Sequence, residues 1–135
     1  MTGEAQQDLF EAARVAQANA HAPYSHFPVG AAVRAASGHV YAGCNVENAS
    51  FPEGICAEAA AIGAMVAAGE REIVEALTVA DGDEVVTCCG GCRQRIREFA
   101  DQDVVVISHG IDGEPLHQTI AQLLPHSFGP EFLGR

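Results

Sequence analysis

Apolar residues recur at three- and four-residue spacing between residues 8 and about 20, which predicts an amphipathic helix. The residues expected on its buried face are Leu9, Ala13, Ala16 and Ala20. Pro23 cannot continue a helix, so residues 24–28 are expected to form a loop. The chain therefore opens with one helix followed by a loop.

Two short runs of small and apolar residues come next. Residues 29–36 and 39–45 each have the composition of a strand, and the turn signal Ser37-Gly38 between them predicts a hairpin. Residues 45–54 are polar and are interrupted by Pro52 and Gly54. This composition is typical of a surface loop, and such loops often carry function.

The strongest helical pattern runs from residue 56 to about residue 69, where nearly every side chain is Ala, Ile, Met or Val. Because hardly any polar residue interrupts it, we expect this helix to be buried on almost all sides. Gly69 is the expected C-terminal cap, since glycine readily adopts the left-handed conformation that ends helices.

The second half of the chain continues to alternate between strands and helices. The expected elements are a strand at 73–80, a turn at 81–83, a helix from Cys89 or Gly90 to about residue 100, a strand at 104–108, a turn at 109–113, a short helix within 115–124 and an irregular tail from residue 125. This order predicts one α/β domain spanning residues 1–135. We expect a three-layer α/β/α sandwich, with helices on both faces of a mixed sheet.

Charge and composition narrow the classes of function. The 135-residue chain has a formal net charge of −11, which repels phosphate backbones and anionic membranes and so disfavours nucleic acid or membrane partners. No apolar run approaches the roughly 18 residues needed to cross a bilayer. Residues 1–8 lack the basic start and apolar core of a signal peptide, so the expected location is cytoplasmic. In a reducing compartment the five cysteines are more typical of metal ligands or core thiols than of disulfides.

Two cysteine motifs carry the candidate chemistry. Cys56 stands two residues before Glu58, and Cys89 and Cys92 form a C-x-x-C pair, with both motifs at strand-to-helix junctions. Three thiolates can hold Zn²⁺ and leave its fourth position open, which is typical of a catalytic zinc site. A helix N-terminus should lower the pKa of Cys56 and of Cys89. Glu58, in the first turn of its helix, can lean back towards the site and move protons.

Other interpretations of these residues stay open. A lone cysteine is most often a buried hydrophobe, and a lone C-x-x-C can be a redox pair. Cys88 could be a fourth ligand that closes a purely structural zinc site. Three thiolates around Zn²⁺ leave a net charge of −1, which the helix ends and Arg93 are expected to offset. Cys44 is assigned to the core of its strand, and all six histidines to solvated surface or loops.

Five motifs together resemble the cytidine deaminase family, in its short-chain homotetrameric form. They cover nearly the whole chain, in order, and are FPVGAA at 27–32, NVENAS at 45–50, CAE at 56–58, CGGCRQ at 89–94 and LPHSFGP at 124–130. The resemblance implies hydrolytic deamination of cytidine and 2′-deoxycytidine in pyrimidine salvage, with one Zn²⁺ per chain. The implied partners are a nucleoside substrate and identical chains that complete each site. A deaminase of another small aminopyrimidine or heterocyclic nucleoside is the nearest alternative.

The resemblance also implies a role for each matching residue. Cys56, Cys89 and Cys92 would bind zinc, and Glu58 would carry protons between water, the pyrimidine N3 and the leaving amino group. The implied substrate-binding residues are Phe27 against the base, Asn45 and Glu47 on the ribose, Asn48, Phe51, Ala57 and, from a neighbouring subunit, Phe128. A carboxylate near the sugar would also repel a 5′-phosphate and so favour nucleosides.

Three positions depart from the family pattern. Cys88 replaces the usual Pro before the C-x-x-C pair, and it places a further thiol beside a ligand. Phe51 stands where the family often has Tyr, so the hydroxyl is lost. Ala59 stands where some members have an Arg close to a zinc thiolate, which removes one source of positive charge.

Overall fold

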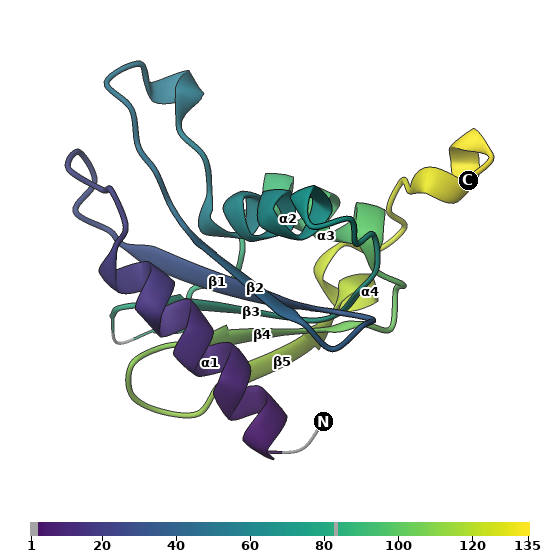
Figure 1. Cartoon of the computed structure of the whole chain (residues 1–135), viewed down its shortest axis with the longest axis horizontal. Helices are drawn as coiled ribbons and strands as arrows, with labels where there is room; N and C mark the ends of the chain where they lie inside the picture. The colour runs from purple at the N-terminus through teal and green to yellow at the C-terminus, as the bar shows by residue number, and fades with distance from the viewer. Residues whose placement is uncertain (1–2, 83) are drawn as a thin grey trace.

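The computed structural model describes residues 3–82 and 84–135, and a five-stranded mixed sheet forms its centre (Figure 1). The strands run in the order β2-β1-β3-β4-β5. They are β1 (Val29–Ala35), β2 (Val40–Cys44), β3 (Ile73–Ala80), β4 (Val105–His109) and β5 (Leu116–Thr119). The β3–β4 pair is parallel, whereas β1–β2, β1–β3 and β4–β5 are antiparallel.

Helices cover both faces of this sheet. Helix α1 (Gly3–Ala18) lies on one face, and α2 (Ala57–Ala67) and α3 (Gly90–Phe99) lie on the other, with α4 (Ile120–Leu123) after β5 (Figure 1). Short 3₁₀ turns, η1 (Phe51–Glu53) and η2 (Pro130–Leu133), lie in the loop before α2 and in the tail. The predicted α/β/α sandwich is confirmed.

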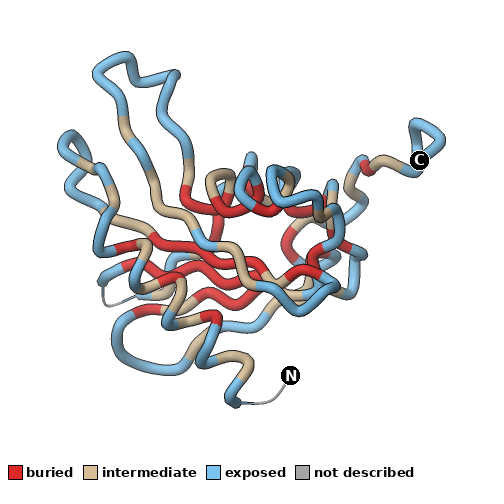
Figure 2. The backbone as a smooth tube through the Cα atoms, viewed as in Figure 1, coloured by how far each residue is buried: buried red, intermediate tan, exposed pale blue. Residues whose placement is uncertain are grey.

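The two faces of the sheet each bury an apolar layer (Figure 2). Glycines bring the helices close to the strands. A Cβ at Gly30 of β1 would lie 1.9 Å from the Ala13 carbonyl oxygen of α1, and one at Gly43 of β2 would lie 2.5 Å from the Ala61 nitrogen of α2. Because only glycine lacks a Cβ, these two positions set the distance between the layers.

The first helix differs from its prediction. It begins at Gly3 and ends at Ala18, so it starts five residues earlier than expected. Leu9 and Ala13 are buried as predicted, but the third buried position is Gln17. The Gln17 amide Nε2 donates to the Pro28 carbonyl at 3.2 Å and to Asp81 Oδ1 at 2.8 Å. These hydrogen bonds satisfy a polar group that the apolar pattern had placed outside the buried face.

Helix α2 is not buried on almost all sides, as the sequence had suggested. Gly63, Ala64 and Ala67 are exposed, and the buried residues are Ala57, Glu58, Ala61, Ile62 and Met65. Composition alone cannot separate an exposed alanine from a buried one, since alanine is small and a strong helix former. Gly69 has φ +94° just beyond the helix end, as the cap prediction requires.

The short helix expected within residues 115–124 is confirmed as α4, although it covers only Ile120–Leu123. The strand that precedes it was not predicted. Leu116–Thr119 forms β5, which pairs with the free edge of β4, and α4 follows. Thr119 then starts α4 through a capping box, in which its hydroxyl accepts from the Gln122 N–H at 3.2 Å. The strand exists because β4 offers it backbone partners, which local sequence does not reveal.

Smaller differences concern the loops and two single residues. The turn predicted at 81–83 includes Asp83, which lies outside the described residues. Cys44 is only half-buried, because β2 is an edge strand. His109 is half-buried at the end of β4 with its ring centroid 4.3 Å from that of Phe10, while the other histidines are exposed. Among residues 3–82 and 84–135, no helix has both the length and the apolar character that a membrane span requires.

Candidate active site

The cysteines predicted as ligands lie at the starts of two neighbouring helices. Cys56 is the N-cap of α2 and Cys89 is the N-cap of α3, and both have extended backbone conformations. Each carbonyl accepts the first hydrogen bond of its helix, from Ala60 N–H and Arg93 N–H respectively. Cys92 follows one turn later on α3 and is fully buried. The positive ends of two helix dipoles therefore converge on one cluster of thiols.

The three sulfur atoms fit a single tetrahedral metal ion. All three lie within 4.8 Å of one another, and Cys56 Sγ is 3.8 Å from Cys89 Sγ. Sulfurs on a tetrahedron with zinc–sulfur bonds of about 2.3 Å are about 3.8 Å apart. Cys88 is not part of this cluster, so the three thiols leave one coordination position open. This donor set is the arrangement of a catalytic zinc site rather than of a closed structural one.

Burial and hydrogen bonding shift the pKa values of four neighbouring thiols in different directions; these are Cys56, Cys88, Cys89 and Cys92. Burial raises the pKa of Cys56 and of Cys92, and it raises the pKa of Cys88 to about 11. Burial also opposes ionisation of Cys89, but the Cys92 backbone N–H and the other thiols outweigh it and lower the pKa of Cys89. The predicted lowering of the thiol pKa is therefore confirmed for Cys89 and is wrong for Cys56. A bound cation deprotonates the thiols that coordinate it.

The carboxylate of Glu58 lies beside this cluster, in the second position of α2. It is 5% exposed, and its Oε2 accepts a hydrogen bond from the Thr78 hydroxyl on β3 at 3.1 Å. A carboxylate this deeply buried needs such a partner to be held in one orientation. The Glu58 side chain is therefore held in one orientation at the site and does not point towards solvent.

A cavity of about 340 Å³ opens above the cluster and gathers most of the predicted substrate-binding residues. Those that line it are Phe27, Asn45, Glu47, Phe51 and Ala57, together with Cys56, Glu58 and Cys89. Its size is at the lower end of the range for small-molecule pockets. The sequence analysis missed Val86 and Thr87, which also line it, and Thr78.

Asn45 and Glu47 both hold the loop that forms one wall of the cavity. The Asn45 amide donates to the Phe27 carbonyl at 2.9 Å and accepts from the Val29 N–H at 2.9 Å. Glu47 Oε1 accepts from the backbone N–H groups of Tyr24 and Ser25, and Oε2 accepts from the Ser25 hydroxyl. The Ser25 hydroxyl bond lowers the pKa of Glu47. Both side chains are preorganised and keep spare hydrogen-bonding capacity.

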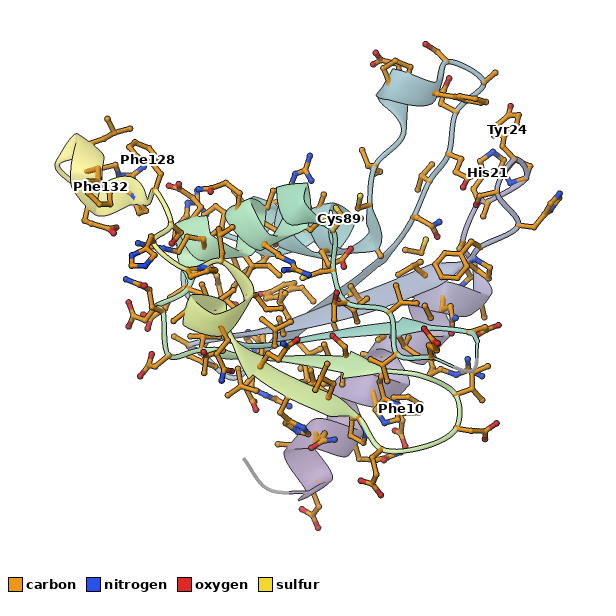
Figure 3. All side chains as sticks on the ribbon, turned by 180° about the vertical axis from the view of Figure 1, so that it is seen from behind. Phe10, His21, Tyr24, Cys89, Phe128 and Phe132 are labelled. Atoms are coloured by element: carbon orange, nitrogen blue, oxygen red, sulfur yellow. The ribbon has the colours of Figure 1, made fainter. Side chains whose placement is uncertain are left out.

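Two predicted substrate contacts lie elsewhere. Asn48 lies outside the cavity, and its Oδ1 accepts from the Ser50 N–H at 2.8 Å. Phe128 is on the C-terminal tail, which extends away from the body of the molecule, with Phe132 stacked on it at 5.4 Å between centroids (Figures 1 and 3). Phe128 is 57% exposed and does not line the cavity of its own chain.

The positive charge at the site comes from a different residue than predicted. Arg93 donates to the carbonyls of Cys88 and Leu123 and to the Thr87 hydroxyl, so it fixes the loop before α3. Arg95 Nη1 instead lies 3.4 Å from Cys92 Sγ. No sequence signal distinguishes the two arginines, because the direction of each side chain depends on its tertiary neighbours.

Thr78 provides a test of how Glu58 is held. We expect Thr78→Val, which keeps the side-chain shape but removes the hydroxyl, to lower kcat by roughly 10- to 100-fold, because a hydrogen bond to a charged group contributes roughly 1.5–3 kcal/mol. Thr78→Ser, which keeps the donor, is the matched control and should retain most activity. Equal kcat in the valine variant and the native protein would show that the bond does not position Glu58.

Comparison with known proteins agrees with this geometry. Residues 3–108 match the family described as "Cytidine and deoxycytidylate deaminase zinc-binding region". A cytidine deaminase of Sporosarcina psychrophila is 39% identical over 127 residues, covering 94% of this chain and 93% of the relative. A crystal structure of cytidine deaminase from Burkholderia pseudomallei has a TM-score of 0.87 and 37% identity, covering 95% of this chain and 100% of the other.

Fold and site together define a class of hydrolase that uses a thiolate-held metal and a buried carboxylate. Within that class, the chain belongs to the zinc-dependent cytidine and deoxycytidylate deaminase family. The assigned roles of individual site residues stay predictions.

Proposed function

We propose that this protein is a zinc-dependent cytidine deaminase. It converts cytidine and 2′-deoxycytidine into uridine and 2′-deoxyuridine with release of ammonia, as one catalytic domain in cytoplasmic pyrimidine salvage. The observation that carries the proposal is the buried Glu58 carboxylate beside three thiols, at a nucleoside-sized cavity. The five cysteines, all free, fit a reducing compartment.

Glu58 performs the proton transfers of the proposed reaction. A zinc ion held by Cys56, Cys89 and Cys92 would lower the pKa of water and so supply a nucleophile at neutral pH. Glu58 takes a proton from the attacking water and gives it to N3 of the pyrimidine while the water oxygen bonds to C4. Glu58 then takes the remaining water proton, which is on the C4 hydroxyl, and gives it to the amino group. The C4–N bond breaks, ammonia leaves and a carbonyl forms at C4. Thr78 keeps the carboxylate directed at this path.

The cavity wall favours a nucleoside over a nucleotide. Glu47 is ionised at neutral pH, because the Ser25 hydroxyl lowers its pKa, and its remaining lone pairs can accept from ribose hydroxyls. The same negative charge repels a 5′-phosphate. Phe27, 39% exposed at the cavity, offers a ring against which a pyrimidine can pack.

The acting form in this proposal is a homotetramer whose subunits complete one another's sites. Exposed apolar residues concentrate on the projecting segments, with Phe51 at 73%, Phe128 at 57% and Phe132 at 65% exposure. Aromatic side chains this exposed are characteristic of interfaces between subunits. We propose that Phe128 enters the cavity of a neighbouring chain, since it cannot contribute to its own.

A substrate panel tests the proposed function. The expected result is turnover of cytidine and 2′-deoxycytidine, with kcat/KM for cytosine and for cytidine 5′-monophosphate lower by at least about 100-fold. Cytosine has no sugar to contact the cavity wall, and the phosphate of the monophosphate is repelled by Glu47. In Glu47→Gln, the ratio of kcat/KM for cytidine to kcat/KM for cytidine 5′-monophosphate should decrease. The proposal would be contradicted if neither nucleoside were turned over, or if kcat/KM were higher for the monophosphate than for cytidine.

A further inference from the structure

Arg95 is the only described arginine that contacts a sulfur of the three-cysteine cluster. It lies on α3, and its Nη1 is 3.4 Å from Cys92 Sγ. The arginines paired with carboxylates are Arg14, Arg34, Arg97 and Arg135. Arg71 and Arg93 bond backbone carbonyls, and Arg93 a hydroxyl as well. In the described chain, Arg95 is therefore the one arginine that contacts a thiol of the three-cysteine cluster, and its charge is permanent.

The Arg95 guanidinium lies close to the glycine one turn before it on α3. The side chain folds back along α3, so that a Cβ at Gly91 would lie 3.2 Å from Arg95 Nη1. A glycine at this position leaves the guanidinium room beside the first turn of the helix. Arg95 thus contacts Cys92 from outside the cavity and leaves the space above the cluster open.

The negative charge of the metal-bound cluster would be partly offset by the contact between Arg95 and Cys92. Three thiolates around Zn²⁺ carry a net charge of −1, and the buried Glu58 carboxylate adds a further negative charge beside them. Ala59, next to Glu58 on α2, supplies no compensating charge. A guanidinium N–H that donates to a thiolate withdraws electron density from the sulfur, which then donates less to the metal.

We propose that Arg95 is a positioning residue that offsets the negative charge of the thiolates through Cys92 and so keeps the bound metal electrophilic towards water. The inference rests on the zinc site of the proposed function. The first turn of α2 carries no cationic side chain, so the compensating side chain comes from α3.

The absorption spectrum of the cobalt(II)-substituted protein tests this role directly. Removing the N–H donor raises the energy of the Cys92 sulfur electrons, so in Arg95→Gln the thiolate-to-cobalt band should move to longer wavelength. Arg95→Lys keeps a cation that can donate to sulfur and should give an intermediate band. Arg71→Gln removes an equal charge beyond the other end of α2, about 16 Å from Cys56 by helix length, and should leave the band unchanged.

Kinetics on the zinc enzyme provide the second measurement. The expected result for Arg95→Gln is a kcat lower by about tenfold with KM nearly unchanged, in line with other residues that act through a metal ligand. A native band and native kcat in Arg95→Gln would overturn the proposal, and so would the same changes in Arg71→Gln. A wild-type protein without any thiolate-to-cobalt band would overturn the zinc site itself, whereas a band that Arg95→Gln fails to move would overturn only the role of Arg95.

Discussion

Glu58→Gln is expected to retain its zinc and to lose activity by roughly 1,000- to 10,000-fold, at the upper end of the contribution of a single general acid–base group. Glutamine has nearly the same shape and its amide oxygen can still accept from the Thr78 hydroxyl at this buried position. It cannot take up and release a proton near neutral pH, so both proton transfers are lost. Steady-state kinetics and zinc content of the same preparation measure the effect.

Two further results make the Glu58 test decisive. Glu58→Asp keeps a carboxylate on a side chain that is one methylene shorter, and should recover part of the activity. A glutamine variant with near-native kcat would exclude Glu58 as the proton carrier. Loss of zinc in the glutamine variant would contradict the assignment of Glu58 as a residue that is not a ligand.

Phe128→Ala should lower kcat/KM for cytidine by up to about 100-fold, since stacking of one base on an aromatic ring contributes roughly 1–3 kcal/mol. Phe128 is remote from the cavity of its own chain and lies on a projecting tail (Figure 3). Leu133→Ala changes a still more exposed apolar residue of that tail, with 74% exposure, and should have little effect on kcat/KM. Kinetics of the two variants provide the comparison.

Mixed oligomers distinguish action within a chain from action between chains. A Phe128→Ala chain keeps Glu58, and a Glu58→Gln chain keeps Phe128. If Phe128 acts on a neighbour's site, co-expression of the two impaired variants should give hybrid oligomers that are more active than either variant alone. Failure to recover activity, despite confirmed hybrid assembly, would contradict the shared site.

The position of the tail follows from its contacts with α3. Arg97, buried in that helix, donates to the Ser127 hydroxyl at 2.8 Å and forms an ion pair with Glu131. A Cβ at Gly129 would lie 2.3 Å from Arg97 Nη2, so the backbone passes directly over the guanidinium. Gln94 also donates to the Phe128 carbonyl at 2.9 Å. The helix that carries two of the three thiols thus also sets where Phe128 leaves the body.

The cluster of three cysteines was predictable because the geometry within each motif is local. Cys89 and Cys92 are one helical turn apart, and Cys56 and Glu58 share the first turn of α2. Helix starts at these points were indicated by the switch from loop composition to helical composition. The meeting of the two motifs follows once both helices pack into the same apolar layer on one face of the sheet (Figure 1).

Contacts that depend on tertiary structure were not predictable in the same way. Thr78 reaches Glu58 from the central strand β3, across the layer interface, and nothing in its sequence neighbourhood differs from an ordinary strand. Arg95, and not the predicted Arg93, contacts a thiol of the cluster, and nothing in the local sequence distinguishes the two arginines. Strand β5 was not predicted, since only its pairing with the edge of β4 makes these residues a strand.

The central claim is tested most directly by following the ultraviolet change as cytidine is converted to uridine, with zinc measured on the same sample of purified protein. The predicted result is conversion by a preparation that contains about one zinc per chain, with activity lost when a chelator removes the metal and regained when zinc is restored. Protein that holds one zinc per chain and leaves cytidine unchanged would contradict the account.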